Sequence, residues 1–160
     1  MRIIKYNVEQ KLILLLSIFS ILFALYVEFF LGHKPCNLCL LQRVPYVITI
    51  ILIIFVSIFK NLEKISFLLL SLIFFSATFL SLYHVGIEQG IIIESAVCGS
   101  NIDISTTNKE EILKQLNKKQ ISCKAVTFTI FGQSLATINV IISFILSVIT
   151  LKIFMNYEKK

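Results

Sequence analysis

Four long runs of residues with almost no charge constrain the fold of this chain more than any other feature. A helix needs about 20 apolar residues to cross about 30 Å of hydrocarbon. The runs are Leu12–Leu31, whose only charge is Glu28, Val44–Phe59, Ile65–Ile87, and a stretch within Ala125–Leu151 that carries no charge. The sequence therefore predicts an all-α membrane protein, a four-helix transmembrane bundle with spans over about 12–31, 40–59, 65–87 and 127–151.

The composition agrees with a membrane protein and excludes other classes. Apolar residues make up 57% of the chain and charged residues 15%, against roughly 45–50% and about 25% in typical soluble proteins. A soluble domain of this size would expose a large apolar surface, so water-soluble enzymes and disordered chains are excluded. The net charge of +6 is typical of basic residues at the cytoplasmic ends of membrane helices. We therefore expect a lipid bilayer, and no nucleic acid, as a partner.

A cleavable signal peptide is the alternative interpretation of the first run, because Arg2, Lys5 and Lys11 precede it. The run is longer than the roughly 7–15 apolar residues of a signal peptide, and bulky Phe29 and Phe30 stand where a site of small residues would be expected. We therefore expect a retained span, and one integral membrane domain over residues 1–160.

Four spans place both ends of the chain on one side of the membrane. The basic residues that gather on that side are Arg2, Lys5, Lys11, Lys60, Lys64, Lys152, Lys159 and Lys160. Positive charge favours the cytoplasmic side, so both termini are predicted to be cytoplasmic. Lys34, Arg43 and five lysines between positions 109 and 124 lie on the other side, and the loop lysines are mostly away from helix ends.

A long extracytoplasmic loop is expected over about 88–124, between the third and fourth spans. It holds most of the polar residues and is too long for a bare turn, so function is expected there. Thr107-Asn108-Lys109-Glu110 reads as a capping box ahead of an apolar stripe. This pattern predicts a short helix on the membrane surface.

All four cysteines lie on one side of the membrane in this topology. Cys36 and Cys39 precede the second span, whereas Cys98 and Cys123 lie in the long loop. If the basic residues set the orientation, the thiols lie in the compartment where disulfides persist, which in a bacterium is the periplasm. The two pairs can then exchange electrons directly.

Cys36-Asn37-Leu38-Cys39 is a C-x-x-C motif where the second span begins. The positive end of a helix and nearby Arg43 favour thiolate, the form that attacks disulfides and transfers electrons. Two other interpretations stay open: a structural disulfide, and half of a zinc site that Cys98 and Cys123 complete. The second pair lacks the close spacing usual in structural zinc sites.

Arg43 lies near the outer interface, four residues after Cys39. On a continuous helix the two would share a face. Pro45, however, favours a helix that begins near Val44 and leaves Arg43 just ahead of it. An ordinary interfacial arginine and a functional one both fit this position.

His84 and Glu88 lie one helical turn apart at the outer end of the third span. Ionisable groups at membrane depth are costly, and a histidine there can donate a hydrogen bond or a proton to a ligand between helices. The alternative is a solvated side chain near the interface. Glu28 is expected to be interfacial and His33 to be a loop residue.

The combined pattern resembles the disulfide bond formation protein B (DsbB) family. The resemblance rests on four spans, on Lys34-Pro35-Cys36-Asn37-Leu38-Cys39-Leu40-Leu41-Gln42-Arg43, on Tyr83-His84-Val85-Gly86-Ile87-Glu88, and on Phe131-Gly132-Gln133-Ser134-Leu135-Ala136 with Asn139. It covers nearly the whole chain.

The resemblance implies a protein-dithiol:quinone oxidoreductase of the bacterial inner membrane. Cys98 and Cys123 would form a disulfide that takes two electrons from a periplasmic thioredoxin-fold thiol oxidase, a DsbA-like partner. Cys36 and Cys39 would reoxidise that pair and pass the electrons to ubiquinone or menaquinone from the quinone pool, with Cys39 facing the quinone. Arg43 matches the family arginine at the quinone site, and His84 would be a quinone neighbour. No metal is implied.

This chain departs from the family pattern at Ile91-Ile92-Ile93-Glu94-Ser95, where the family often has an aromatic residue followed by Gly-Pro, and it contains no Trp. Because a relay disulfide must open as well as close, we expect Cys98 and Cys123 to lie in a mobile loop rather than a packed one. The competing interpretations are a four-span structural protein with static disulfides and a membrane zinc-binding protein.

Overall fold

The computed structural model describes residues 2–59, 62–94, 98, 122–124, 128–130 and 132–157, with side chains from residue 8 onward. The helices are α1 (Arg2–Phe29), α2 (Asn37–Leu41), α3 (Val44–Ile58), α4 (Glu63–Glu88) and α6 (Leu135–Tyr157). Strands β1 (Thr129–Ile130) and β2 (Gln133–Ser134) form an antiparallel pair in which Thr129 lies opposite Ser134. The predicted capping box at Thr107-Asn108-Lys109-Glu110 and most of the predicted 88–124 loop lie outside the described residues.

Four segments of the described chain are long and apolar enough to cross a membrane, which confirms the predicted four-helix membrane fold. They are Val8–Phe29, Asn37–Ile58, Glu63–Glu88 and Leu135–Tyr157. The second consists of α2 and α3, which are separated by a turn at Gln42 and Arg43. Pro45 stands in the first turn of α3, where its missing N–H is not needed, so Arg43 precedes the helix.

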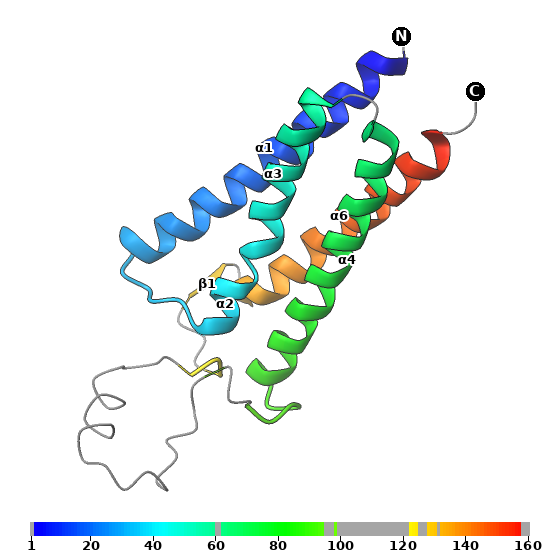
Figure 1. Ribbon diagram of the computed structural model, residues 1–160. Helices are drawn as coiled ribbons and strands as arrows, with labels where there is room; N and C mark the ends of the chain where they lie inside the picture. The colour runs from blue at the N-terminus through cyan, green and yellow to red at the C-terminus, as the bar shows by residue number, and fades with distance from the viewer. Residues whose placement is uncertain are drawn as a thin grey trace, which may run out of the picture.

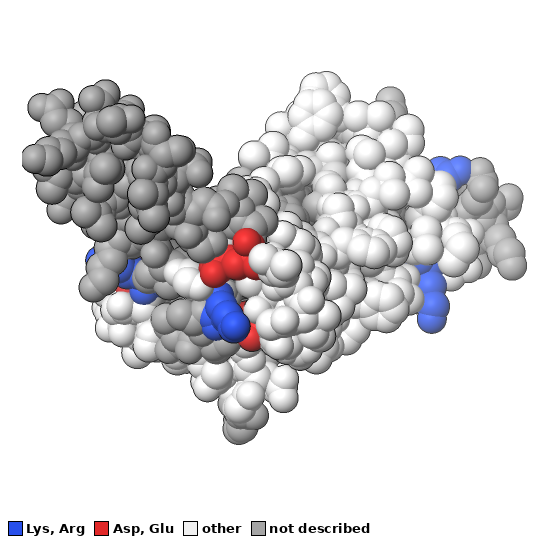
Figure 2. Space-filling view, turned by 90° about the horizontal axis from the view of Figure 1, so that it is seen from below, with Lys and Arg blue, Asp and Glu red and all other residues white. Residues whose placement is uncertain are grey.

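The helices form two closely packed pairs, α1 with α3 and α4 with α6, as Figure 1 shows, and α3 also contacts α4. Both ends of the chain lie at the same end of the bundle (Figure 1). Figure 2 looks from below, onto the opposite end, and among the described residues it shows separate charged side chains beside a larger uncharged area. Many large apolar side chains face outward, among them Leu15, Phe19, Ile51 and Phe79, as a lipid-facing surface requires.

α4 is the central helix of the core. Phe67, Leu70 and Phe74 are fully buried in a cluster with side chains of the other three long helices. α4 approaches α6 through small residues, because Ser71 and Ser147 donate to each other's backbone carbonyls at 3.2 and 3.1 Å. Small residues with such hydrogen bonds are typical of close helix packing in membranes.

The C-terminal end of α4 turns back sharply on itself. Gly90 has a positive φ of 74°, and the N–H groups of Ile91 and Ile92 donate to the carbonyl of Gly86. A Cβ at Gly86 would lie only 2.6 Å from Cδ1 of Ile92, so a larger residue at this position would require the Ile92 side chain to move. This turn brings the following Glu94 to the segment that contains Cys123.

Candidate redox site

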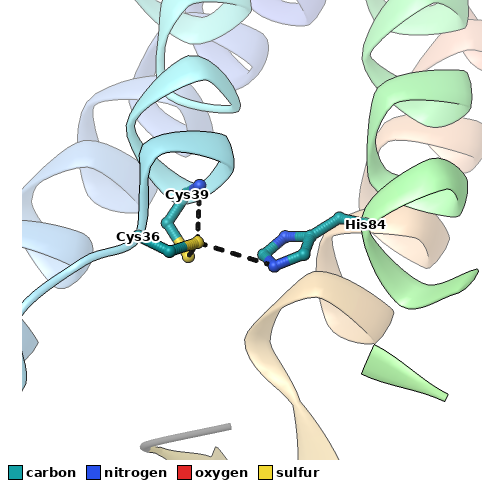
Figure 3. A group of neighbouring side chains, drawn as sticks. All are labelled: Cys36, Cys39 and His84. Carbon is teal, nitrogen blue, oxygen red and sulfur yellow. Dashed lines mark hydrogen bonds between the residues drawn. The ribbon is translucent and has the colours of Figure 1, made fainter. Parts of the chain in front are cut away.

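The first cysteine pair lies at the N-terminus of α2. Cys36 is the N-cap residue, and its sulfur accepts a hydrogen bond from the backbone N–H of Cys39 at 3.2 Å. The two sulfur atoms lie 2.7 Å apart, and the Cys36 sulfur lies 3.6 Å from Nε2 of His84 on α4 (Figure 3). The cap geometry of the motif therefore directs the Cys36 sulfur toward a neighbouring helix.

Hydrogen bonding favours the thiolate form of Cys36. The pKa of Cys36 is lowered from 9.0 to about 4, chiefly by the hydrogen bond with the Cys39 thiol; burial opposes this, and the hydrogen bond with His84 also lowers the pKa. A thiolate is the form that attacks a disulfide or gives up electrons. The reduced pair is therefore prepared for thiol–disulfide exchange at neutral pH.

His84 is almost completely buried, with 2% of its surface exposed. Its Nδ1 lies 2.8 Å from the amide nitrogen of Gln42, and its Nε2 lies 3.7 Å from the carboxylate of Glu88. Glu88 also accepts a hydrogen bond from the hydroxyl of Ser134 at 2.5 Å. His84 is therefore not the solvated side chain of the alternative interpretation, because side chains of Cys36, Gln42 and Glu88 lie around its imidazole.

Arg43 forms an ion pair with Glu28. Its guanidinium donates to the Glu28 carboxylate at 2.7 Å, and both side chains are only about one-fifth to one-quarter exposed. The pair joins the C-terminal end of α1 to the turn before α3. Arg43 is therefore held by a carboxylate of its own chain, unlike an arginine that only reaches toward lipid headgroups.

Cys98 and Cys123 form a disulfide, the pairing implied by the family resemblance. Both are buried, at 0% and 2% exposure, in a cluster with Cys36, Leu38 and Ile87. The expectation that these two cysteines avoid a packed environment is wrong. The apolar sulfur atoms gain contacts against α2 and the end of α4, and this packing brings the two cysteine pairs together.

Glu94 holds the segment around Cys123 in place. Its carboxylate accepts hydrogen bonds from the backbone N–H of Cys123 and from the hydroxyl of Ser122, both at 2.7 Å. In the sequence, Glu94 stands out only within a departure from the family pattern. Its contact with a residue 29 positions away depends on the turn at Gly90, which no local motif identifies.

A cavity of about 680 Å³ opens beside the first cysteine pair. Its polar end includes Cys39, Arg43 and His84, and Cys36 and Cys123 also line it. Most of its other lining residues are apolar side chains of α1 and α6, from Leu16 to Val27 on α1, a length of about 16 Å at 1.5 Å per residue. The cavity therefore joins the thiols to the membrane-embedded part of the bundle.

The structure also brings in polar residues that the sequence analysis gave no role. Gln42, Tyr46 and Asn139 are linked by hydrogen bonds next to His84. Gln42 and Asn139 stood within motifs that support the family resemblance, but their spacing alone does not show that they meet. Their separation of 97 residues explains why only the fold identifies the network.

Two adjacent cysteine pairs at one end of four apolar helices define a membrane-embedded thiol–disulfide oxidoreductase. The disulfide bond formation protein DsbB family matches residues 10–153. The chain belongs to this family, and it is a multi-pass membrane protein of disulfide bond formation.

Two curated proteins are similar to this chain, and the name of the second agrees with this assignment. An uncharacterized protein of Rickettsia prowazekii is 29% identical over 141 residues, which cover 87% of this chain and 82% of the relative. Disulfide bond formation protein B of Acinetobacter baylyi is 26% identical over 136 residues, or 81% of this chain and 80% of the relative. No solved structure matches the chain significantly.

Proposed function

We propose that this protein is a protein-dithiol:quinone oxidoreductase of the bacterial inner membrane, formed by one integral membrane domain. It reoxidises a periplasmic, DsbA-like thioredoxin-fold disulfide donor and passes the electrons to ubiquinone or menaquinone. The observation that carries the proposal is that both cysteine pairs belong to one buried cluster beside a largely apolar cavity. A static structural protein does not require this juxtaposition.

The first step is exchange between the partner and Cys98–Cys123. A thiolate of the partner attacks one sulfur of this disulfide and forms a mixed disulfide, and the second partner thiol then releases it. The partner is oxidised, and Cys98 and Cys123 receive two electrons and two protons. Glu94 holds the Cys123 backbone during this exchange.

The second step transfers the two electrons to Cys36 and Cys39. A thiolate of the Cys98/Cys123 pair attacks the Cys36–Cys39 disulfide, and the second thiol completes the exchange, which restores the Cys98–Cys123 disulfide. The burial of Cys36, Cys98 and Cys123 in one cluster supports this route. The product is a reduced Cys36/Cys39 pair whose first thiol ionises readily.

The cavity residues fit a quinone. Apolar walls suit an isoprenoid tail, whereas Arg43 and His84 offer hydrogen-bond donors to ring oxygens at the end where Cys39 lies. When bound, a quinone supplies an acceptor for two electrons and two protons. Arg43 would bind a carbonyl oxygen, and Cys39 would face the ring.

The basic residues support an orientation with cytoplasmic termini and periplasmic cysteines. An impermeant thiol reagent applied to intact spheroplasts after reduction should therefore label Cys36, Cys39, Cys98 and Cys123. Labelling is expected without permeabilisation. A cysteine added at the C-terminus, on the predicted cytoplasmic side, is the control that should stay unlabelled. Labelling of these residues only after permeabilisation would reverse the orientation.

The relay is tested with purified protein, quinone and a reduced thioredoxin-fold dithiol under anaerobic conditions. We expect one quinone to be reduced for each partner disulfide formed. A Cys123→Ser protein should oxidise the partner at least about a hundredfold more slowly, since the loop disulfide cannot form, while its quinone binding is retained. Normal partner turnover by this variant would refute the relay, and absence of turnover in the wild type would favour a static structural protein.

A further inference from the structure

Gln42 is a buried residue in direct contact with His84. It is 8% exposed, and it lies between the imidazole of His84 and the side-chain amide of Asn139. The proposed electron transfer uses Cys36, Cys39, Arg43 and His84, and gives Gln42 no part. The hydrogen bonds around Gln42 nevertheless determine which nitrogen of His84 carries its proton.

The direction of these hydrogen bonds is set at Ser81. The hydroxyl of Ser81 donates its one proton to the carbonyl of Ala77 at 2.9 Å, so toward Asn139 it can only accept. The Asn139 atom that lies 2.7 Å from this hydroxyl is therefore the amide nitrogen. The amide oxygen of Asn139 then faces Tyr46, whose hydroxyl donates to it.

The same orientation continues from Asn139 through Gln42 to His84. The Asn139 amide nitrogen also donates to the amide oxygen of Gln42 at 3.2 Å, which turns the amide nitrogen of Gln42 toward Nδ1 of His84 at 2.8 Å. An amide nitrogen donates and does not accept. Nδ1 must therefore be the acceptor, and the proton of a neutral His84 lies on Nε2.

The groups around Nε2 agree with this assignment. The Cys36 sulfur lies 3.6 Å away and a Glu88 carboxylate oxygen lies 3.7 Å away. Each of these groups accepts a hydrogen bond when Cys36 is a thiolate. If Nε2 were unprotonated, its lone pair would face these acceptors and no hydrogen bond could form between them.

We propose that Gln42, oriented by Asn139, is a positioning residue that holds His84 in the tautomer with its proton on Nε2, directed at the Cys36 sulfur. The use of this tautomer rests on the proposed redox function. The Nε2–H group stabilises the Cys36 thiolate that forms each time the Cys36–Cys39 disulfide is reduced, and no proton has to leave the imidazole.

The same arrangement opposes the zinc-binding alternative. Cys36, Cys39 and His84 offer three ligand atoms within 4.8 Å of one another. A zinc-bound imidazole, however, uses a lone pair on the metal-facing nitrogen and donates its other N–H to an acceptor. Gln42 presents a donor at that place, so the hydrogen bond that suits a thiolate is unfavourable for zinc.

Nitrogen NMR of ¹⁵N-histidine-labelled, reduced protein tests the proposal without quinone or partner. The chain has only two histidines, and loss of a signal set in His84→Gln assigns His84. In spectra recorded at a pH high enough for His84 to be neutral, we expect a protonated Nε2 and an unprotonated Nδ1. Gln42→Glu replaces the donor by an acceptor of the same shape, so Nδ1 should shift to the protonated region of the spectrum.

Gln10→Glu is the matched control, because Gln10 is equally buried at 8% and contacts Ser66 far from the cysteines along the bundle. It should leave both nitrogen signals of His84 unchanged. A protonated Nδ1 in the wild type, or an unchanged Nδ1 in Gln42→Glu, overturns the role of Gln42. Failure of quinone reduction with the expected spectrum would instead overturn only the proposed function.

Discussion

A Cys39→Ala protein should reduce quinone at least about a thousandfold more slowly than the wild type, as removal of a reacting nucleophile does elsewhere. Cys39 lines the cavity, and its sulfur is 2.7 Å from that of Cys36. Without Cys39 the disulfide at this site cannot re-form, so two electrons have no route from the thiols to quinone. The rate is measured anaerobically from quinone absorbance after mixing with reduced partner.

The same variant should still oxidise one equivalent of partner, since the Cys98–Cys123 disulfide does not include the altered residue. Quenched-flow counting of partner thiols should show one rapid turnover and no second one. Steady quinone reduction near the wild-type rate would contradict the role of Cys39. A missing first turnover would show that Cys98–Cys123 is not the oxidant of the partner.

The pH dependence of Cys36 alkylation gives a control for this variant. In the reduced wild type the pKa of Cys36 is lowered from 9.0 to about 4, chiefly by the hydrogen bond with Cys39. Its alkylation rate should therefore stay constant as the pH falls from 9 and should decrease only as the pH approaches about 4. In reduced Cys39→Ala the decrease should begin at a higher pH, as followed by mass spectrometry of the Cys36 peptide.

Arg43→Ala should weaken quinone binding by about 10- to 150-fold, which corresponds to the roughly 1.5–3 kcal/mol of a charge-assisted hydrogen bond to a buried ligand. Arg43→Lys should weaken it less, because lysine keeps the charge but lacks the planar guanidinium. The apparent KM for quinone measures the effect. An arginine that only anchors the interface would tolerate lysine fully.

The ion pair with Glu28 requires a matched variant, because Arg43→Ala also leaves that carboxylate without its partner. Glu28→Gln alone should keep most of the quinone affinity. The double variant Arg43→Ala/Glu28→Gln should bind quinone as weakly as Arg43→Ala. Recovery of affinity in the double variant would show that Arg43 acts only by neutralising Glu28.

The sequence by itself determined the fold class and the elements that carry the site. Uncharged runs of span length have few alternatives, because an unsatisfied backbone in hydrocarbon is too costly for anything but a helix or a closed barrel. The start of α3 near Val44 follows equally directly from Pro45. The C-x-x-C motif and the family pattern identified Cys36, Cys39, Arg43 and His84 as candidate site residues, because each of them lies within a short local motif.

Only the tertiary structure decided how these candidates meet. Arg43 pairs with Glu28 across 15 positions, Asn139 reaches Gln42 across 97, and the loop cysteines pack beside Cys36 instead of standing apart from the bundle. Such contacts depend on the relative rotation of packed helices and on the turn at Gly90. The rotation of each helix results from many weak packing contacts between residues that are distant in sequence. Local spacing therefore placed each donor and thiol on an element, while helix packing determined its partner.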